Sequence, residues 1–244
     1  MEKYSIGQDL VQRRMAGSDL QNLRSIHKAM GRLPHGTVGD VHFSEISLDV
    51  DHFARKIVHW MSQKIPDPIE VDRVIAGFRL RGRLTEIYGQ GCVHTRSARQ
   101  KAKDLLKSWI YHLVLSDLPP QGWTPNTILI CQDSAWRFPR VTNNEEILHS
   151  LLEIFRYGST QPLQFFSESA IEYAQGRHRR AYPRARALDS ARRKSQGSEF
   201  AWGESEDPYY RLCFKHSDPL DQNFEKLAMG ILGPLLEHCE KIIM

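Results

Sequence analysis

The sequence predicts a mixed α/β protein, in which helices flank one small mixed sheet. Three observations support this fold class. The first 65 residues and the region after residue 169 have helical character. Between these regions, apolar and polar residues alternate over 78–87, as they do in a half-buried strand. A strongly amphipathic helical segment then follows over 99–115.

Length and composition agree with this fold class. The 244 residues suffice for one large domain, or for a domain with a small satellite. A hydrophobic content of 41% and a charged content of 25% are ordinary for a soluble globular protein. No apolar run approaches the roughly 20 residues that cross a bilayer, and the first residues lack the basic and apolar regions of a signal peptide. We therefore expect a cytoplasmic protein with no membrane partner.

The N-terminal region is expected to hold two helices. Ser18 is a suitable N-cap for a first helix that stops near Gly31. The turn-rich residues 33–39 form a connector, and a second helix is expected over about 49–64. The buried face of that second helix should consist of Phe53, Ile57, Trp60 and Met61.

The periodicity then changes to that of strands. Residues 69–71 and 73–75 have strand character, the alternation over 78–87 is clearer, and 91–94 form a plausible neighbouring strand. Over 78–87 the apolar face carries Phe78, Leu80 and Leu84. The opposite face carries Arg79, Arg81, Arg83 and Thr85. The sequence therefore predicts a strand with one basic face.

The helix expected over 99–115 has two distinct faces. Arg99, Lys103 and Lys107 recur every four residues as a basic stripe. Pro119 and Pro120 are expected to end this unit. The apolar face is formed by Ala102, Leu105, Leu106, Trp109, Ile110 and Leu113.

The remaining elements complete the predicted domain. Strands are expected over 127–131, 136–138 and 163–166, and helices over 144–157, 169–175, 188–195, 208–215 and 220–242. We divide the chain into a helical N-terminal segment (1–66), a core (67–170) and a helical C-terminal segment packed on that core (171–244).

Several kinds of functional site are excluded by the residue pattern. The four cysteines lie far apart, which favours buried free thiols over a zinc site or an iron–sulfur cluster. Residues 77–82 copy the glycine spacing of a phosphate-binding loop, but they lack its lysine and lie within a strand. His94 and His112 could lie near a cleft, although lone histidines are usually polar core or surface residues. We expect neither a metal nor a cofactor.

Positive charge is unevenly distributed. Between Arg73 and Lys107 there are nine Lys or Arg residues against two acidic residues. From Arg177 to Lys194 there are eight against Asp189 alone. Such clusters fit either an acidic partner such as nucleic acid or a solvated surface.

The strand–strand–helix unit over 78–115 resembles the core of the PD-(D/E)XK (restriction-endonuclease-like) nucleases. In that family, carboxylates on two strands hold a divalent metal ion and a lysine assists. Where the family has carboxylates, this chain has Thr85 and His94, and where it has lysine, this chain has Arg96. A hydroxyl and an imidazole cannot replace two hard anionic oxygen ligands of magnesium. The resemblance therefore implies a catalytically degenerate nuclease-like core.

The resemblance extends over nearly the whole chain to the RecC family, the gamma subunits of bacterial exodeoxyribonuclease V. Six short matches lie in the right order, of which each is weak alone. They are Gly31–Gly39, Gly82–Leu84, Leu105–Leu113, Trp136–Pro139, Leu151–Gly158 with Pro162–Leu163, and Gly203–Glu204 with Asp207, Tyr209 and Arg211. The stretch from Arg177 to Lys194 departs from the family pattern by being more basic.

This resemblance implies a role in a heterotrimeric helicase–nuclease that processes double-strand breaks for recombinational repair. It implies RecB and RecD as partners, a forked duplex or single strand as the DNA, and a longer subunit of which this chain is a fragment. The DNA-binding candidates are Arg79, Arg81, Arg83, Arg96, Arg99 and Lys103. Two alternatives stay open, namely an interaction scaffold without DNA contact and an active metal-dependent nuclease. The arginines of 79–83 could also pair with acidic residues of this chain or of a partner.

Overall fold

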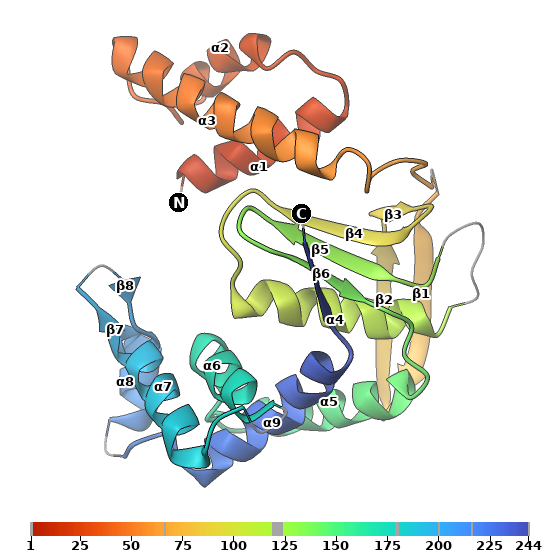
Figure 1. The fold of residues 1–244 in the computed structure, drawn as a ribbon, viewed down its shortest axis with the longest axis vertical. Coiled ribbons are helices and arrows are strands. Elements are labelled where there is room, and N and C mark those ends of the chain that lie inside the picture. The colour runs from red at the N-terminus through yellow and green to blue at the C-terminus, as the bar shows by residue number, and fades with distance from the viewer. Residues whose placement is uncertain are drawn as a thin grey trace.

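The computed structural model of the protein describes residues 2–65, 67–118, 124–178, 181–199, 201–215 and 217–243 (Figure 1). Its helices are α1 (Glu2–Met15), α2 (Gln21–Ala29), α3 (Gly36–Ile57), α4 (Ala102–Ser116), α5 (Asn144–Gly158), α6 (Ser167–Arg177), α7 (Arg184–Gln196), α8 (Pro208–Phe214) and α9 (Gln222–Glu237), with a 3₁₀ turn η2 (Glu204–Glu206). Its strands are β1 (Ile69–Ile75), β2 (Phe78–Leu84), β3 (Ile87–Tyr88), β4 (Gly91–Arg96), β5 (Thr127–Cys131), β6 (Ala135–Phe138), β7 (Gly197–Ser198), β8 (Ala201–Trp202) and β9 (Glu240–Ile242).

Within the described residues, the central sheet has five strands in the order β3-β4-β5-β6-β9. The pair β4–β5 is parallel and the other pairs are antiparallel. Parallel neighbours need a long crossover, and α4 lies in the connection between β4 and β5. The predicted mixed α/β fold with a small mixed sheet and flanking helices is therefore confirmed.

Alternation along β5 divides the core into two layers. Ile128 and Ile130 pack against the N-terminal helices, whereas Leu129 and Cys131 pack against α4 and the C-terminal helices. Every residue of β5 is buried, as expected for a strand covered on both faces. Figure 1 shows the same arrangement, with α1 and α3 on one side of the sheet and α4 on the other.

The N-terminal helices differ from those predicted. Helix α3 begins at Gly36, about thirteen residues before the expected start, and ends at Ile57. The turn-like composition of 33–39 concealed this start, because the first turn of a helix tolerates residues that would weaken its interior. Phe53 and Ile57 are buried as predicted, whereas Trp60 and Met61 lie beyond the helix and are partly buried.

The predicted strand over 78–87 does not belong to the central sheet. Strand β2 pairs along its whole length with β1 in a separate two-stranded hairpin, and only β3 joins the sheet. A tight turn joins β1 to β2, with positive φ angles of 52° at Ala76 and 76° at Gly77, as in the turns that favour two-residue hairpins. The alternation had fixed which face of the strand is apolar, but not which strand it pairs with.

Helix α4 packs on the sheet as predicted. Leu105, Trp109 and Leu113 have no exposed surface and share a core with Leu129 and Phe138 of the sheet. Ile110, expected on the apolar face, is 40% exposed. Pro119 and Pro120, the expected end of this unit, lie outside the described residues.

Two elements of the C-terminal half were mispredicted. Residues 163–166 form no strand and lead into α6, with Phe166 as its N-cap residue. The helix expected over 220–242 ends at Glu237, and Glu240–Ile242 form β9 at the edge of the sheet. Strand pairing depends on distant partners, so a helical pattern in the local sequence does not reveal it.

Helix α9 is held to α6 and α7 by a polar cluster. Glu225, which is 8% exposed, accepts a hydrogen bond from Tyr173 (2.5 Å) and two from Arg184 (2.7 and 2.5 Å). The hydrogen bonds from Arg184 lower the pKa of Glu225 despite its burial. This cluster holds Arg184, a residue of the basic stretch, against α6 and α9.

The four cysteines differ in how deeply they are buried. Cys92 and Cys131 are buried as predicted, but Cys213 is exposed and Cys239 is half-buried. Burial raises the pKa of both buried thiols to about 12, which keeps them protonated at neutral pH.

Among the described residues, none of the helices is long and apolar enough to cross a membrane.

Candidate functional site

The three hairpin arginines lie on the outer face of β2, as the alternation predicts. Arg79, Arg81 and Arg83 are 57%, 62% and 69% exposed, respectively. Two of them face acidic residues on β1, since Arg81 lies opposite Asp72 and Arg83 lies opposite Glu70. The basic face predicted from one strand is thus a mixed-charge face of two strands.

Each hairpin arginine is engaged in an ion pair. Arg79 makes two hydrogen bonds to Asp72 (2.7 and 2.8 Å), and Arg81 donates to the same carboxylate at 3.2 Å. Arg83 pairs with Glu70 at 2.7 Å. The hydrogen bond from Arg79 lowers the pKa of Asp72. Three arginines therefore share two carboxylates, which leaves this face with one surplus positive charge.

A second candidate region is a cleft of about 240 Å³ where β4 ends, between α1 and the first half of α4. Its polar lining includes Glu86, His94, Arg96, Asp104 and Lys107. Thr85, which the resemblance sets at a position of a catalytic carboxylate, is exposed and is not among the lining residues. The chain leaves the strand conformation at Thr85 and Glu86, so the alternation that placed Thr85 beside the arginines ends there, and the adjacent Glu86 lines the cleft.

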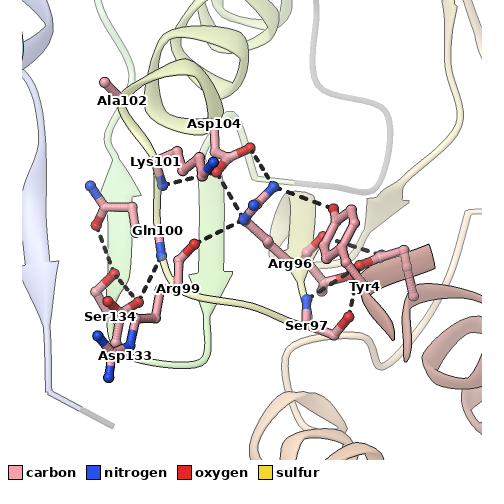
Figure 2. A network of polar contacts seen from close by, with 12 residues as sticks. Tyr4, Arg96, Ser97, Arg99, Gln100, Lys101, Ala102, Asp104, Asp133 and Ser134 are labelled. Atoms are coloured by element: carbon pink, nitrogen blue, oxygen red, sulfur yellow. Dashed lines mark hydrogen bonds and ion pairs between the residues drawn. The ribbon is translucent and has the colours of Figure 1, made fainter. Parts of the chain in front are cut away.

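Arg96 is the centre of a polar network in this cleft (Figure 2). Its guanidinium pairs with Asp104 at 3.1 Å, donates to the carbonyl of Arg99 at 2.9 Å, and lies 4.6 Å from the centre of the Tyr4 ring. The side chain of Arg96 is 12% exposed. Arg96 is therefore held by the protein itself and is not available at the surface.

Helix α1 packs beside the end of β4. The side-chain amide of Gln8 accepts from the backbone N–H of Ser97 (3.2 Å) and donates to the carbonyl of Thr95 (3.4 Å). Tyr4, one turn earlier, lies over Arg96. Sequence reasoning missed both residues, because nothing in a local pattern tells which distant strand a surface glutamine or tyrosine will contact.

His94 is directed into the protein. One ring nitrogen lies 2.9 Å from the hydroxyl of Ser108 and the other 3.4 Å from the sulfur of Cys92. Burial, and secondarily the charge of Lys107, lower the pKa of His94 to about 4. At neutral pH it is thus an uncharged imidazole held in the wall of the cleft.

The carboxylates of the cleft are also engaged. Glu86 accepts a hydrogen bond from Tyr88 at 3.1 Å, and Asp104 accepts from the backbone N–H of Lys101 at 3.0 Å while pairing with Arg96. Among the described residues, none of the His, Cys, Asp and Glu groupings could hold a metal ion. The arrangement stabilises the end of β4 and the start of α4.

The six DNA-binding candidates fall into two groups. Arg96, Arg99 and Lys103 lie near the start of α4, where Arg99 and Lys103 are exposed. The hairpin itself lies near the second half of α4, since residues 80–84 line a groove together with Ile110 and Val114. The two groups lie in different parts of the fold, because the β1–β2 hairpin is separate from the central sheet (Figure 1).

The basic stretch from Arg177 to Lys194 is partly neutralised within the chain. Arg184 pairs with Glu225, and Arg192 pairs with Asp218 at 3.0 Å. Arg186 lies 4.1 Å from the ring centre of Tyr182. Residues 179 and 180 of this stretch lie outside the described ranges.

Comparison with known proteins supplies the family. The chain is similar to the RecBCD enzyme subunit RecC of Escherichia coli (strain K12), with 21% identity over 229 residues. These residues are 90% of this chain and 20% of the E. coli subunit, so the chain spans about a fifth of that relative. The family model of the RecC C-terminal domain matches residues 1–178. The chain therefore belongs to the RecC C-terminal domain family.

Proposed function

We propose that this chain is a non-catalytic DNA-handling and subunit-assembly domain of a RecBCD-type helicase–nuclease in double-strand break repair and recombination. Membership of the RecC family supports a place in such a complex. In this proposal the core is a degenerate PD-(D/E)XK fold, whose antiparallel pair β3–β4, helix α4 and parallel strand β5 support the resemblance. RecB and RecD are the proposed partner subunits, and the cytoplasm is the proposed location.

The observation that carries the proposal is the environment of the three residues that stand where the nuclease family has its catalytic residues. Thr85 lies outside the cleft, His94 is uncharged and held by Ser108, and Arg96 is in an ion pair with Asp104. A nuclease of this class needs carboxylate oxygens that are free to coordinate divalent metal and to activate water. The cleft carboxylates, Glu86 and Asp104, are instead bonded to Tyr88 and Arg96, respectively.

The purified protein is accordingly expected to degrade neither single- nor double-stranded DNA with magnesium or manganese. The measurement is release of acid-soluble label from end-labelled and uniformly labelled DNA. Glu86→Gln is the control variant, since it removes the one cleft carboxylate without an ion pair partner in this network. Metal-dependent cleavage by the wild type that Glu86→Gln abolishes would overturn the proposed absence of catalysis.

The DNA-handling part of the proposal is tested at the hairpin. Binding of a forked duplex should weaken in the Arg81→Ala, Arg83→Ala double variant, because phosphate contacts release counterions. The slope of log K against log salt should become shallower by about 1.8, which corresponds to two lost phosphate contacts. The matched control is Arg24→Ala with Lys28→Ala on α2, which removes two cations that also pair with an aspartate.

The ion pairs of the hairpin favour a second candidate function, that of a protein-interaction scaffold. Asp72 and Glu70 neutralise most of the charge that would attract phosphate. If the double variant keeps the wild-type salt slope but loses binding to RecB- or RecD-type subunits, the arginines belong to a protein interface. DNA contact by this surface would then be excluded.

A further inference from the structure

Helix α7 carries most of the basic stretch, with five Lys or Arg residues against one acidic residue. Two of these cations, Arg184 and Arg192, pair with carboxylates at or near α9. Arg186, Arg193 and Lys194 differ from them, because none of the three makes an ion pair within the described residues. Their charge is therefore not neutralised by the described part of the chain.

The two unpaired arginines lie on one face of α7. Seven residues separate Arg186 from Arg193, which is close to two turns of a helix, and Ser190 lies between them on the same face. The guanidinium of Arg186 lies 4.1 Å from the ring centre of Tyr182, and that of Arg193 donates to the hydroxyl of Ser190 at 3.2 Å. The opposite face of the helix is buried through Ala187, Ala191 and Ser195.

The β7–β8 hairpin adds an aromatic ring at the end of this face. Gly197 follows Arg193 by one helical turn and pairs with Trp202 across the hairpin. Trp202 is 86% exposed, the largest value among the aromatic side chains of the described residues. Figure 1 shows the hairpin where α7 ends. An open indole ring therefore stands close to the basic last turn of α7.

Two glycines fix the hairpin to the end of α7. A Cβ atom at Gly203 would lie 2.3 Å from the carbonyl oxygen of Ser195, so the chain after Trp202 touches the backbone of the helix. Gly197 has a φ angle of 75°, in the region that favours glycine. Ser205 donates to the same carbonyl of Ser195 at 2.9 Å. The ring of Trp202 is thus carried by a backbone that is anchored to α7.

Nearby acidic residues do not neutralise this face. Asp189 pairs with Arg192 at 4.0 Å, and Glu199 lies in the hairpin turn, at the end away from α7. The exposed neighbours of Trp202 on the hairpin, Ser198 and Ala201, are polar or small. They offer no apolar patch of the kind that forms the core of a protein interface. Unpaired guanidinium groups beside an open aromatic ring are instead the combination that binds single-stranded nucleic acid.

We propose that Arg186, Arg193 and Trp202 form a surface, the α7 surface, that binds single-stranded DNA. The arginines contact phosphates and one unpaired base stacks on the indole. The surface spans about 16 Å at 1.5 Å per residue, which is at most about five nucleotides at 3.4 Å each. A duplex is a poorer ligand, because its bases are already stacked on each other.

The inference rests on the proposed DNA-handling function and gives it a second contact surface. This surface is independent of the β1–β2 hairpin and of the cleft at the end of β4. It also lies outside residues 1–178, the part that the family model matches. The added contact therefore belongs to the segment in which the chain is more basic than the family pattern.

The first test removes the two arginines. The Arg186→Ala, Arg193→Ala variant should bind a 20-nucleotide oligo-dT more weakly, measured by fluorescence anisotropy over a salt series. The slope of log K against log salt should become shallower by about 1.4, since each phosphate contact to a single strand contributes about 0.7. Arg55→Ala with Lys56→Ala is the matched control, because these two cations lie in the last turn of α3 and also make no ion pair within the described residues.

The second test removes the ring. Trp202→Ala should weaken oligo-dT binding about 5- to 150-fold, the usual effect of one lost stacking contact, while the salt slope stays that of the wild type. Tyr157→Ala on α5, which removes another exposed ring, should bind as the wild type does. Oligo-dT should quench the tryptophan emission of the wild type. Trp202→Phe should lose that quenching but keep most of the affinity, because phenylalanine still offers a face for stacking.

The outcomes separate this inference from the proposed function. If the wild type binds a forked duplex but no oligo-dT, or if all α7-surface variants bind oligo-dT as the wild type does, the inference is wrong while DNA handling stands. If the wild type binds neither DNA, both fail. If Trp202→Ala keeps its DNA affinity but loses binding to RecB- or RecD-type subunits, the ring belongs to a protein interface and the inference is overturned.

Discussion

Replacing Trp109 with alanine is expected to lower the free energy of unfolding by about 3–5 kcal/mol. Trp109 has no exposed surface and lies between three rings, with centre-to-centre distances of 5.8 Å to His112, 5.9 Å to Phe138 and 5.8 Å to His238. Its removal leaves a cavity where α4, β6 and the end of α9 meet. Urea unfolding followed by far-UV circular dichroism measures the loss.

Trp109→Phe is the control for this prediction. Within the described part of the chain, the indole nitrogen of Trp109 has no hydrogen-bond partner, so phenylalanine removes volume without orphaning a polar group. We expect it to lose less than half of the free energy lost by Trp109→Ala. A loss below about 1 kcal/mol for alanine would contradict the burial of this residue, given the usual cost of such truncations.

Acid is expected to begin to destabilise the protein above the pH range in which carboxylates titrate. Burial is the main cause that lowers the pKa values of His94 and His112 to about 4. His112 is fully buried, with its two ring nitrogens 3.1 Å from the hydroxyl of Thr127 and 2.8 Å from the carbonyl of Pro139. A neutral imidazole that donates to Pro139 and accepts from Thr127 satisfies both contacts.

The direction of the pH effect follows from proton binding. Below about pH 6.5 the unfolded chain protonates both histidines, whereas the folded chain does so only near pH 4. The unfolded state binds more protons in this window, so stability is full above pH 6.5 and falls toward pH 4. At pH 5 the expected loss is about 2 kcal/mol for each histidine.

Urea unfolding at pH 7.5 and pH 5.0 measures this loss. His112→Gln preserves a donor and an acceptor without a proton to gain, so it should remove about half of the difference between the two pH values. His52→Gln on the exposed side of α3 is the matched control and should keep the full difference. Equal acid sensitivity of wild type and His112→Gln would contradict the assignment of His112 as a buried neutral group.

Much of the fold could be predicted from local pattern. The strand at Thr127–Cys131 and the helix beginning at Asn144 were predicted at those positions, and the helix over 99–115 differs from α4 by three residues at its start. These elements have strong periodicity and a buried face. The hairpin and β9 could not be placed, because strand partners depend on contacts between distant residues that periodicity does not encode.

The candidate site was less predictable than the fold. The alternation correctly placed Arg79, Arg81 and Arg83 on one exposed face, but the acidic residues opposite them lie on β1, and only the register reveals the pairing. At the cleft, Thr85 and Glu86 lie outside the strands, so the alternation does not extend to them, and Glu86 lines the cleft where Thr85 does not. The contacts of Tyr4 and Gln8 with residues about ninety positions away lie beyond any local pattern.

The position of β9 has a consequence for how the chain is made. Arg137 of β6 and Glu240 of β9, which pair at the sheet edge, are 103 positions apart. At roughly 5–20 residues per second, the ribosome releases β9 about 5–20 s after β6. Helices α5 to α9 emerge in that interval, while the outer edge of β6 keeps unpaired backbone groups. An open strand edge can pair with another chain, so nascent chains are exposed to edge-to-edge association during this interval.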